Sequence, residues 1–360
     1  MKRFLSLLLC LALIAALAGC GSNNNSSDAA TPTPANSTSE NATPTPGSDN
    51  PSDPTATPTD APKERAQVNV AVLKGPTAIG MLKLMSDDEA GTSANDYDFT
   101  VAGTADSIVA SVIKGEIPIA AVPCNLAATL WNKSNGGVTL LAVNTLGVLY
   151  ILETGNTIES VADLKGKTIY ATGAGTTPEY TLRYLLKSNN IDPDNDVNIV
   201  FLSEASEVAA KMAAAGENTI AMLPMPFVIS VLSQNESARI ALDVTKEWEK
   251  TNDSTVVTGV IAVNSKYLSE NKETVDAFLD EYALSTAYAT EHVEETAALA
   301  EHFDIFKAAV AKKAIPYCNI VCLTGSEMKT ATSAYLQILF DSNPASVGGK
   351  LPDDSFYYSR

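Results

Sequence analysis

The sequence predicts a two-lobed α/β protein in which each lobe holds a parallel-rich sheet flanked by helices. Short apolar, β-branched stretches alternate with helical stretches over 68–132, and the same alternation resumes over 168–244. Two extended stretches accompany these blocks: 147–153 lies between them, and 255–263 follows the second. Alternation of strand and helix is typical of a parallel sheet with helices on its faces.

The first block contains four predicted strands with helices between them. Each strand is a short run rich in Val, Ile and Ala, and polar or glycine-containing turns separate the runs. The expected strands are 68–73, 97–101, 117–122 and 138–143. Three helices are expected between them: one that ends near Met85, one over 105–114 and one that ends near Asn132.

The second block opens on a glycine-rich bend with Gly173 and Gly175. Thr176 or Thr177 is expected to cap the helix that follows, since Pro178 and Glu179 are residue types that helix starts prefer. Further strands are expected at 168–171, 197–201, 219–223 and 240–244, with helices at 205–215 and 227–234. After 263 we expect a helical tail, with helices at 273–290, 299–313 and 326–340.

The N-terminal 20 residues have the pattern of a targeting segment. Lys2 and Arg3 precede an apolar run over 4–17, which is shorter than the roughly 20 residues that a membrane span needs. Leu17-Ala18-Gly19-Cys20 then resembles the lipobox of a bacterial lipoprotein signal, which implies lipidation of Cys20. The alternative is an ordinary secretory signal with a chance cysteine. Residues 21–65 are low in complexity and rich in Thr, Pro, Ser and Asn, which predicts a disordered tether.

The charge balance excludes one class of partner. The chain carries 24 Lys and Arg against 42 Asp and Glu, a net charge of −18, and loss of Lys2 and Arg3 would make it −20 (22 − 42). A nucleic-acid binder would have the opposite sign. Beyond Cys10 and Cys20, the remaining Cys124, Cys318 and Cys322 are interpreted as small buried hydrophobes in preference to a disulfide or metal pair.

Candidate ligand-binding residues follow from strand ends. Ligands of α/β proteins bind beyond the carboxyl ends of parallel strands and between lobes. Residues in the turns at those ends are therefore candidates: Pro76, Thr77, Thr104, Asn125, Asn144, Thr176, Thr177, Glu179, Met225 and Pro226. The threonines have helix capping as their alternative role, and Met225 has core packing.

The arginine count bears on the charge of the ligand. Tight anion sites favour the bidentate guanidinium group. From Gln67 to the penultimate residue the chain has only Arg183 and Arg239, and neither is in a predicted cleft turn. A sulfonate-like ligand would depend on Lys74, hydroxyls and backbone N–H groups. A neutral or heterocyclic nutrient is a comparable candidate.

The order of these features resembles a known family. Two blocks of strand–helix units, the turn Asp163-Leu-Lys-Gly-Lys167 and a helical tail are similar to type II solute-binding proteins of ABC importers. Within these the chain resembles the NMT1/THI5-like group, which is related to sulfonate-, nitrate- and taurine-binding proteins. The resemblance implies a periplasmic-binding-protein type II fold, with 66–148 and 256–360 as lobe 1 and 149–255 as lobe 2. It also implies an extracytoplasmic monomer that delivers a small solute to an ABC permease and its ATPase.

No catalytic, metal or cofactor motif stands out. His292 and His302 lie in the helical tail among glutamates, and no nucleophile turn, P-loop or dinucleotide fingerprint is present. A thiamine-pyrimidine synthase of the same fold depends on a cysteine-rich motif and an active-site histidine, which this chain lacks. The sequence thus predicts a binding protein and no enzyme. The alternatives are a lipoprotein enzyme of this fold acting on a small heterocyclic metabolite, and a surface interaction lipoprotein.

Overall fold

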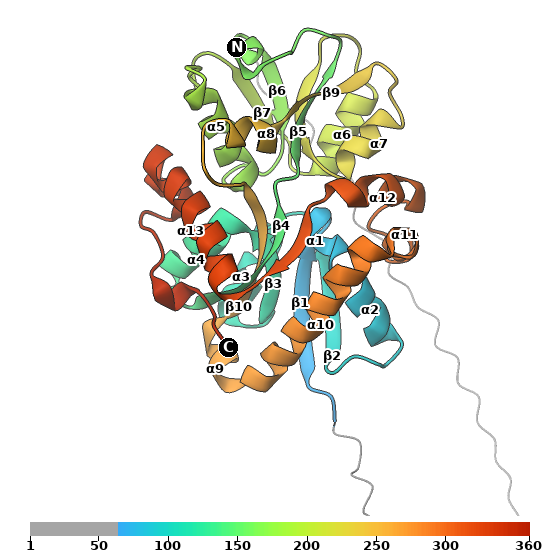
Figure 1. Ribbon diagram of the computed structural model, residues 1–360, viewed down its shortest axis with the longest axis vertical. Helices are drawn as coiled ribbons and strands as arrows, with labels where there is room; N and C mark the ends of the chain where they lie inside the picture. The colour runs from blue at the N-terminus through green and yellow to red at the C-terminus, as the bar shows by residue number, and fades with distance from the viewer. Residues whose placement is uncertain (1–63) are drawn as a thin grey trace, which may run out of the picture. The chain divides into compact units, whose positions relative to one another are not determined.

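Eleven strands form two separate sheets in residues 64–360, the part of the chain described by this computed structural model (Figure 1). The six-stranded sheet has the order β11-β4-β10-β3-β1-β2, and the five-stranded sheet has the order β7-β6-β8-β5-β9. The strands of the first are β1 (Gln67–Leu73), β2 (Asp96–Ala102), β3 (Ile119–Pro123), β4 (Val138–Leu146), β10 (Val257–Asn264) and β11 (Ile320–Leu323). Those of the second are β5 (Leu149–Thr154), β6 (Thr168–Ala171), β7 (Asn198–Phe201), β8 (Ile220–Pro224) and β9 (Ala238–Asp243). The predicted signal peptide, Cys20 and all but the last two residues of the predicted tether lie outside the described residues.

The α/β fold class is confirmed, and both sheets are mixed. β1 pairs in parallel with β2 and β3, whereas β10 runs antiparallel to both β3 and β4. The second sheet repeats this arrangement, since β6 is parallel to β7 and β8 while β5 is antiparallel to β8 and β9. The antiparallel strands β5 and β10 are those that follow each passage of the chain from one sheet to the other. The sheets are therefore less parallel-rich than the strand–helix alternation indicated.

Helices connect the strands and cover the sheets. The first set is α1 (Pro76–Ile79), α2 (Leu82–Glu89), α3 (Asp106–Lys114) and α4 (Cys124–Lys133). The second set is α5 (Thr177–Ser188), α6 (Ala205–Ala213), α7 (Phe227–Leu232) and α8 (Val244–Glu249). The tail contains α9 (Ser265–Glu270), α10 (Lys272–Glu291), α11 (Val293–His302), α12 (Ala308–Ala314) and α13 (Gly325–Ser342).

The tail differs from the prediction at two points. The expected helix 299–313 is wrong, because α11 ends at His302 and α12 begins only at Ala308. Asp304 between them has a φ of 52°, a left-handed conformation that interrupts a right-handed helix. The tail is also not purely helical, since β11 pairs antiparallel with β4 at the sheet edge.

The motif that carried the family resemblance forms a tight turn before β6. Residues Val161–Leu164 make one 3-10 turn, and Asp163 accepts hydrogen bonds from the backbone N–H groups of Ser160 at 2.8 Å and Glu159 at 3.0 Å. Gly166 follows at a φ of 77°, which glycine adopts at little cost. Its N–H donates to the carbonyl of Asp196 at 2.6 Å, so the turn is tied to the segment before β7.

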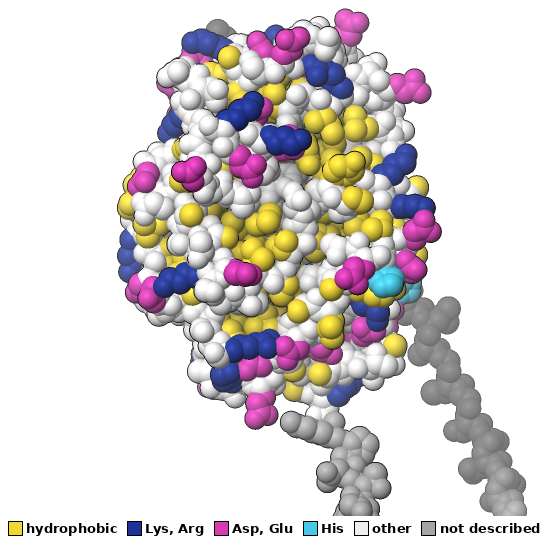
Figure 2. Space-filling model, in the orientation of Figure 1, with side chains coloured by type: hydrophobic (Ala, Val, Ile, Leu, Met, Phe, Trp, Pro, Cys, Tyr) yellow, Lys and Arg dark blue, Asp and Glu magenta, His cyan; other side chains and the backbone are white. Residues whose placement is uncertain are grey.

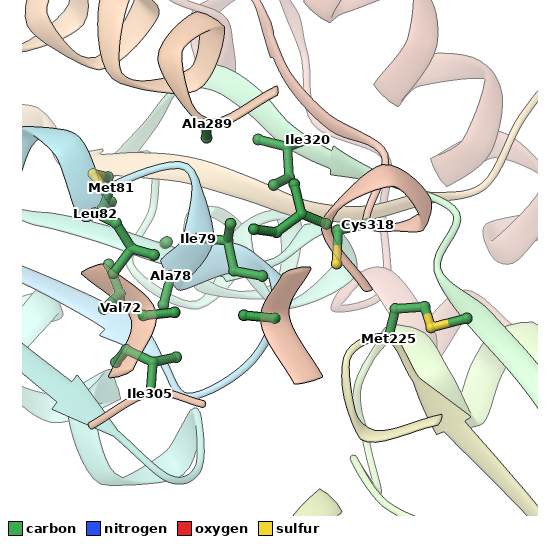
Figure 3. Close-up of a cluster of buried hydrophobic side chains, with 14 of the residues drawn as sticks. Val72, Ala78, Ile79, Met81, Leu82, Met225, Ala289, Ile305, Cys318 and Ile320 are labelled. Carbon is green, nitrogen blue, oxygen red and sulfur yellow. The ribbon is translucent and has the colours of Figure 1, made fainter. Parts of the chain in front are cut away.

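A continuous hydrophobic core joins residues of both sheets. Figure 3 shows side chains from β1, α1 and the C-terminal tail gathered together, with Met225 of the β8–α7 loop at the edge of the cluster. Cys318 belongs to this core and Cys124 to a second cluster, and both are buried and free. Burial raises the pKa of both thiols and that of the half-buried Cys322, to about 11 for the last. These cysteines thus pack as small apolar side chains.

Helix α5 packs against α4 and α13 and so connects the two halves of the molecule on one side (Figure 1). The hydroxyls of Thr181 and Tyr335 lie 2.6 Å apart and are buried. The ring of Trp248 lies between those of Tyr184 and Tyr335, with centroid distances of 4.6 and 5.2 Å. This packing fixes the direction of α5.

One buried ion pair stabilises the five-stranded sheet. Glu153 on β5 is fully buried, and its carboxylate accepts hydrogen bonds from the backbone N–H groups of Thr157 at 2.9 Å and Ile158 at 3.1 Å and pairs with Arg239. Burial raises the pKa of the Glu153 carboxyl, but these hydrogen bonds outweigh burial and hold that pKa below its usual value. Elsewhere, on the face in Figure 2, Lys and Arg side chains are interspersed with Asp and Glu.

Candidate functional site

A cavity of about 390 Å³ lies where the carboxyl ends of β1, β2, β6 and β7 converge between the two sheets. From the first sheet it is lined by the loops after β1 and β2, the end of β3 and one residue of β10: Leu73, Lys74, Gly75, Pro76, Thr77, Gly103, Thr104, Ala105, Asp106, Pro123 and Thr258. From the second it is lined by residues at the ends of β5, β6, β7 and β8: Leu149, Thr172, Gly173, Ala174, Thr176, Pro178, Leu202, Ser203, Ala205, Pro224 and Phe227.

Three of the predicted residues form part of the wall on the six-stranded sheet. Pro76 and Thr77 are buried in the short helix α1, and Thr104 is half-buried in the loop before α3. The Thr77 hydroxyl donates to the carbonyl of Leu73 at 3.2 Å, which leaves its oxygen lone pairs available. The wall thus offers two hydroxyls beside an apolar proline ring.

Thr176 is the predicted residue that lines the cavity from the five-stranded sheet. It occupies the N-cap position of α5, but its hydroxyl donates to the carbonyl of Gly173 at 2.7 Å and accepts no hydrogen bond from the helix. Capping by the side chain of either threonine is therefore wrong. Gly173 has a φ of 77°, so the bend that brings Thr176 and Pro178 to the cavity depends on glycine.

Asn125 and Thr177 lie beside the cavity, outside its lining, and connect the two halves of the molecule. The Asn125 amide on α4 donates to the carbonyls of Ser346 at 2.9 Å and Gly175 at 3.3 Å. Its oxygen accepts from the hydroxyl of Thr177 on α5 at 3.2 Å. Both side chains are buried, so their polar groups are used within the protein.

Glu179, Met225 and Pro226 are also outside the cavity lining. The Glu179 carboxylate accepts from the N–H of Gly175 at 2.7 Å and from Arg183 at 2.6 Å. Met225 is 2 % exposed and belongs to the hydrophobic core (Figure 3). The neighbouring Pro224 and Phe227 of the same loop line the cavity in its place.

Asn144 lies at a β-bulge next to the cavity. Gly259 and Val260 of β10 pair with Thr145 and Val143 of β4, so Asn144 is the extra residue between them. Its side chain is 1 % exposed, and neither its amide nitrogen nor its oxygen has a hydrogen-bond partner. The hydroxyl of Thr258, which lines the cavity, is likewise buried and unpaired. Buried polar groups usually have partners, so Thr258 in the cavity wall and Asn144 beside it have unused hydrogen-bonding capacity.

Several lining residues were missed by the sequence analysis. Leu202, Ser203 and Ala205 follow β7, and the rule on strand ends that selected the other turns applies to them equally. Thr258 was missed because it lies within a strand. No sequence signal marks the ring contact between Phe227 and Phe306, whose centroids are 4.9 Å apart and which joins α7 to the tail.

The histidines and acidic residues form no metal site within 64–360. The His302 ring nitrogen is 2.8 Å from a carboxylate oxygen of Glu89 at the surface, and His292 stacks on Tyr288. Within the same residues, none of the helices is sufficiently long and apolar to span a membrane.

Comparisons with known proteins bear on the class of this fold. The model of the NMT1/THI5 like family matches residues 137–296. An ABC transporter structure from Parabacteroides distasonis is 26% identical, with a TM-score of 0.68, and the match covers 82% of this chain and 99% of that one. The alkanesulfonate-binding protein SsuA from Xanthomonas axonopodis pv. citri, bound to MOPS, is 15% identical over 81% of this chain and 96% of its own, with a TM-score of 0.63.

The periplasmic nitrate-binding protein NrtA from Synechocystis PCC 6803 has a TM-score of 0.59 at 12% identity, and the match covers 79% of this chain and 84% of that one. No curated protein matches the sequence. The fold is that of the periplasmic solute-binding proteins of ABC importers. Together with the family match, it supports the predicted class, a type II solute-binding protein of the NMT1/THI5-like group.

Proposed function

We propose that this protein captures a small solute in the cavity between its two sheets and delivers it to an ABC permease with its ATPase, without chemical conversion. The observation that carries this proposal is that loops of both sheets line one cavity. A volume of about 390 Å³ is in the lower part of the range of roughly 300–1,000 Å³ that small-molecule sites occupy. The cavity therefore suits a small nutrient.

Residues 66–148 and 256–360 are proposed as lobe 1, and 149–255 as lobe 2. The division of the strands supports this, because β1 to β4, β10 and β11 form one sheet and β5 to β9 the other. The chain passes between the sheets twice, after β4 and before β10. Two short passages of this kind permit hinge closure around a bound solute.

Pro76, Thr77, Thr104 and Thr176 are proposed to contact the solute. They come from both sheets, so a bound molecule would join the two lobes and favour a closed arrangement. Asn125 and Thr177 are proposed to stabilise the contact between the lobes through their mutual hydrogen bond.

The location outside the cytoplasm and the lipid anchor at Cys20 are proposals from the N-terminal sequence. Several acyl chains on one residue give stable membrane anchoring. Fractionation of the native host, with Cys20→Ala as the comparison, tests the anchor. Release of wild type and variant alike into the soluble fraction would contradict it.

Native mass spectrometry of the protein purified from its own host tests the function. We expect one co-purified small solute, released unchanged, and a rise in melting temperature when it is added back. A chemically altered product would instead indicate an enzyme of this fold. Absence of any solute together with tight binding of a protein would indicate an interaction protein.

A triple variant tests the cavity residues. Thr77→Ala, Thr104→Ala and Thr176→Ala together are expected to weaken binding of the co-purified solute by at least tenfold, since each hydrogen bond lost costs about 1 kcal/mol. The matched control replaces three exposed serines that bond only to carbonyls of their own helices: Ser188, Ser233 and Ser269. Equal affinity of the two triple variants would contradict the site.

A further inference from the structure

We propose that the cavity selects an uncharged or cationic solute, because the protein's own carboxylates lie at three of the four helix starts that would otherwise attract an anion. This inference rests on the proposed function and adds the charge of the ligand. Helix starts present unpaired backbone N–H groups and favour negative charge. Four helices of at least eight residues, α3, α4, α5 and α6, begin at the cavity, because a residue at the start of each lines it. Carboxylates lie at the starts of three of them, α3, α5 and α6.

The start of α5 is occupied by Glu179. Its carboxylate accepts from the N–H of Gly175 at 2.7 Å, in the bend that carries Thr176 to the cavity. It also accepts from Arg183 at 2.6 Å, and Arg183 binds Asp194 at 2.7 Å as well. The arginine nearest to this loop is therefore held by two carboxylates and is not available to a ligand.

The start of α6 is occupied in the same way. Glu207 in its first turn accepts from the N–H of Ser203 at 2.9 Å. Ser203 lines the cavity, and its backbone donor is already used by this carboxylate. The spacing of four residues between donor and carboxylate is the same as in the Gly175–Glu179 pair.

The start of α3 has two carboxylates. Asp106 is in its first turn and lines the cavity. Glu204 comes from the opposite sheet and lies against Gly103: a Cβ built on Gly103 would be 2.5 Å from its Oε1. The hydroxyl of Ser206 donates to the other oxygen of Glu204 at 3.0 Å and orients the group. A carboxylate of lobe 2 thus covers the loop before α3 at the mouth of the cavity.

Positive charge at the cavity is limited to Lys74, among the residues found to line it. Its ammonium group is 3.8 Å from Asp304 of the tail loop. Among the lining residues Lys74 is therefore matched by one carboxylate, Asp106, and two further carboxylates lie beside the lining: Glu204 against Gly103 and Asp304 near Lys74. The lining itself is neutral (1 − 1 = 0), and the two neighbouring carboxylates add negative charge, which opposes an anion and favours a neutral molecule or an amine.

The test compares wild type with the double variant Asp106→Asn/Glu204→Gln, using methanesulfonate and nitrate as anionic probes. Melting temperature and calorimetry measure binding, and circular dichroism confirms that the variant folds. We expect wild type to show no response to either anion at millimolar concentration. The double variant should bind methanesulfonate about tenfold more tightly for each carboxylate charge removed. This factor corresponds to the repulsion between a carboxylate and the anion when they lie roughly 6 Å apart at an effective dielectric constant of about 40.

The control variant Glu217→Gln/Glu236→Gln removes two exposed carboxylates that do not line the cavity, and we expect it to behave as wild type. Native mass spectrometry should show that the co-purified solute is neutral or cationic at neutral pH. A co-purified anion, or wild-type binding of methanesulfonate as tight as that of the double variant, would overturn this inference and leave the proposed function intact. Absence of any solute and of any probe binding would overturn both.

Discussion

Gly259 lies on β10, next to Asn144 and the cavity residue Thr77. The substitution Gly259→Ala adds one methyl group there and tests how closely these residues pack. The φ of Gly259 lies outside the left-handed region, so the backbone can accept alanine. A Cβ there would nevertheless overlap the side-chain oxygen of Asn144 and would lie 2.8 Å from the Thr77 methyl and 3.4 Å from Cβ of Thr145. Asn144 is 1 % exposed and Thr77 is 7 % exposed, so neither side chain can move into solvent.

The expected cost of Gly259→Ala follows from these contacts. Inserting a methyl group into a closely packed interior typically costs about 1–3 kcal/mol. Relief by rotation of Thr77 would push its side chain into the cavity, so solute affinity should fall as well. The matched control is Gly216→Ala, where nothing lies within 4 Å of the new Cβ and φ is also outside the left-handed region. There we expect no loss of stability, or a gain of up to about 1 kcal/mol from reduced freedom of the unfolded chain.

Urea unfolding followed by circular dichroism measures both variants. The expected difference between them in unfolding free energy is about 1–4 kcal/mol, the sum of the two effects. If Gly259→Ala unfolds at the same urea concentration as Gly216→Ala, the bulge at Asn144 has free space. The close packing inferred between β10, Asn144 and Thr77 would then be refuted.

Three further predictions concern other contacts. Glu153→Gln should lower the unfolding free energy at pH 7, and its difference from wild type should shrink as the pH falls below 4.5. The reason is that a carboxyl whose pKa is lower in the folded state stabilises that state at pH values above its unfolded pKa. This stabilisation is lost as the pH falls through the folded-state pKa. A constant difference from pH 7 to 3 would contradict this. Asn125→Ala should cost about 1–3 kcal/mol in urea unfolding, because buried Thr177 loses its acceptor; an unchanged midpoint would argue against this contact. Phe306→Ala should lower the melting temperature and weaken solute binding through Phe227, and wild-type values for both would refute a coupling between the tail and the cavity.

Most of the fold could be predicted from the sequence, because its signals are local. Apolar β-branched runs gave the strands, and the bend at Gly173 is where the structure has a φ of 77°. The break at Asp304 was not predictable, since an aspartate with positive φ leaves no pattern in the surrounding residues. The strand β11 was missed because it is only four residues long and follows the four helices α9 to α12.

The candidate site was predicted less completely than the fold. Strand ends give the position of a residue along the chain, but they do not give the direction of its side chain. Asn125 follows β3 as expected, yet its amide group bonds to Thr177 of α5 and to the carbonyl of Ser346. Asn144 is displaced by a bulge that depends on the pairing of β4 with a strand more than 100 residues away. Both outcomes depend on tertiary contacts that the local sequence does not contain.

The unequal contacts on the two sides of the cavity have a consequence for how a solute enters. On the side of α5 and α13, left in Figure 1, the halves share buried hydrogen bonds and stacked aromatic rings. On the side of α7 and α12, right in Figure 1, they share buried apolar packing that includes the Phe227–Phe306 contact. Apolar contacts are not directional, so we expect separation of the lobes to begin at this edge, while the hydrogen-bonded edge acts as the hinge. We expect a single entrance beside residues 303–307, and loading and release of the solute through the same opening.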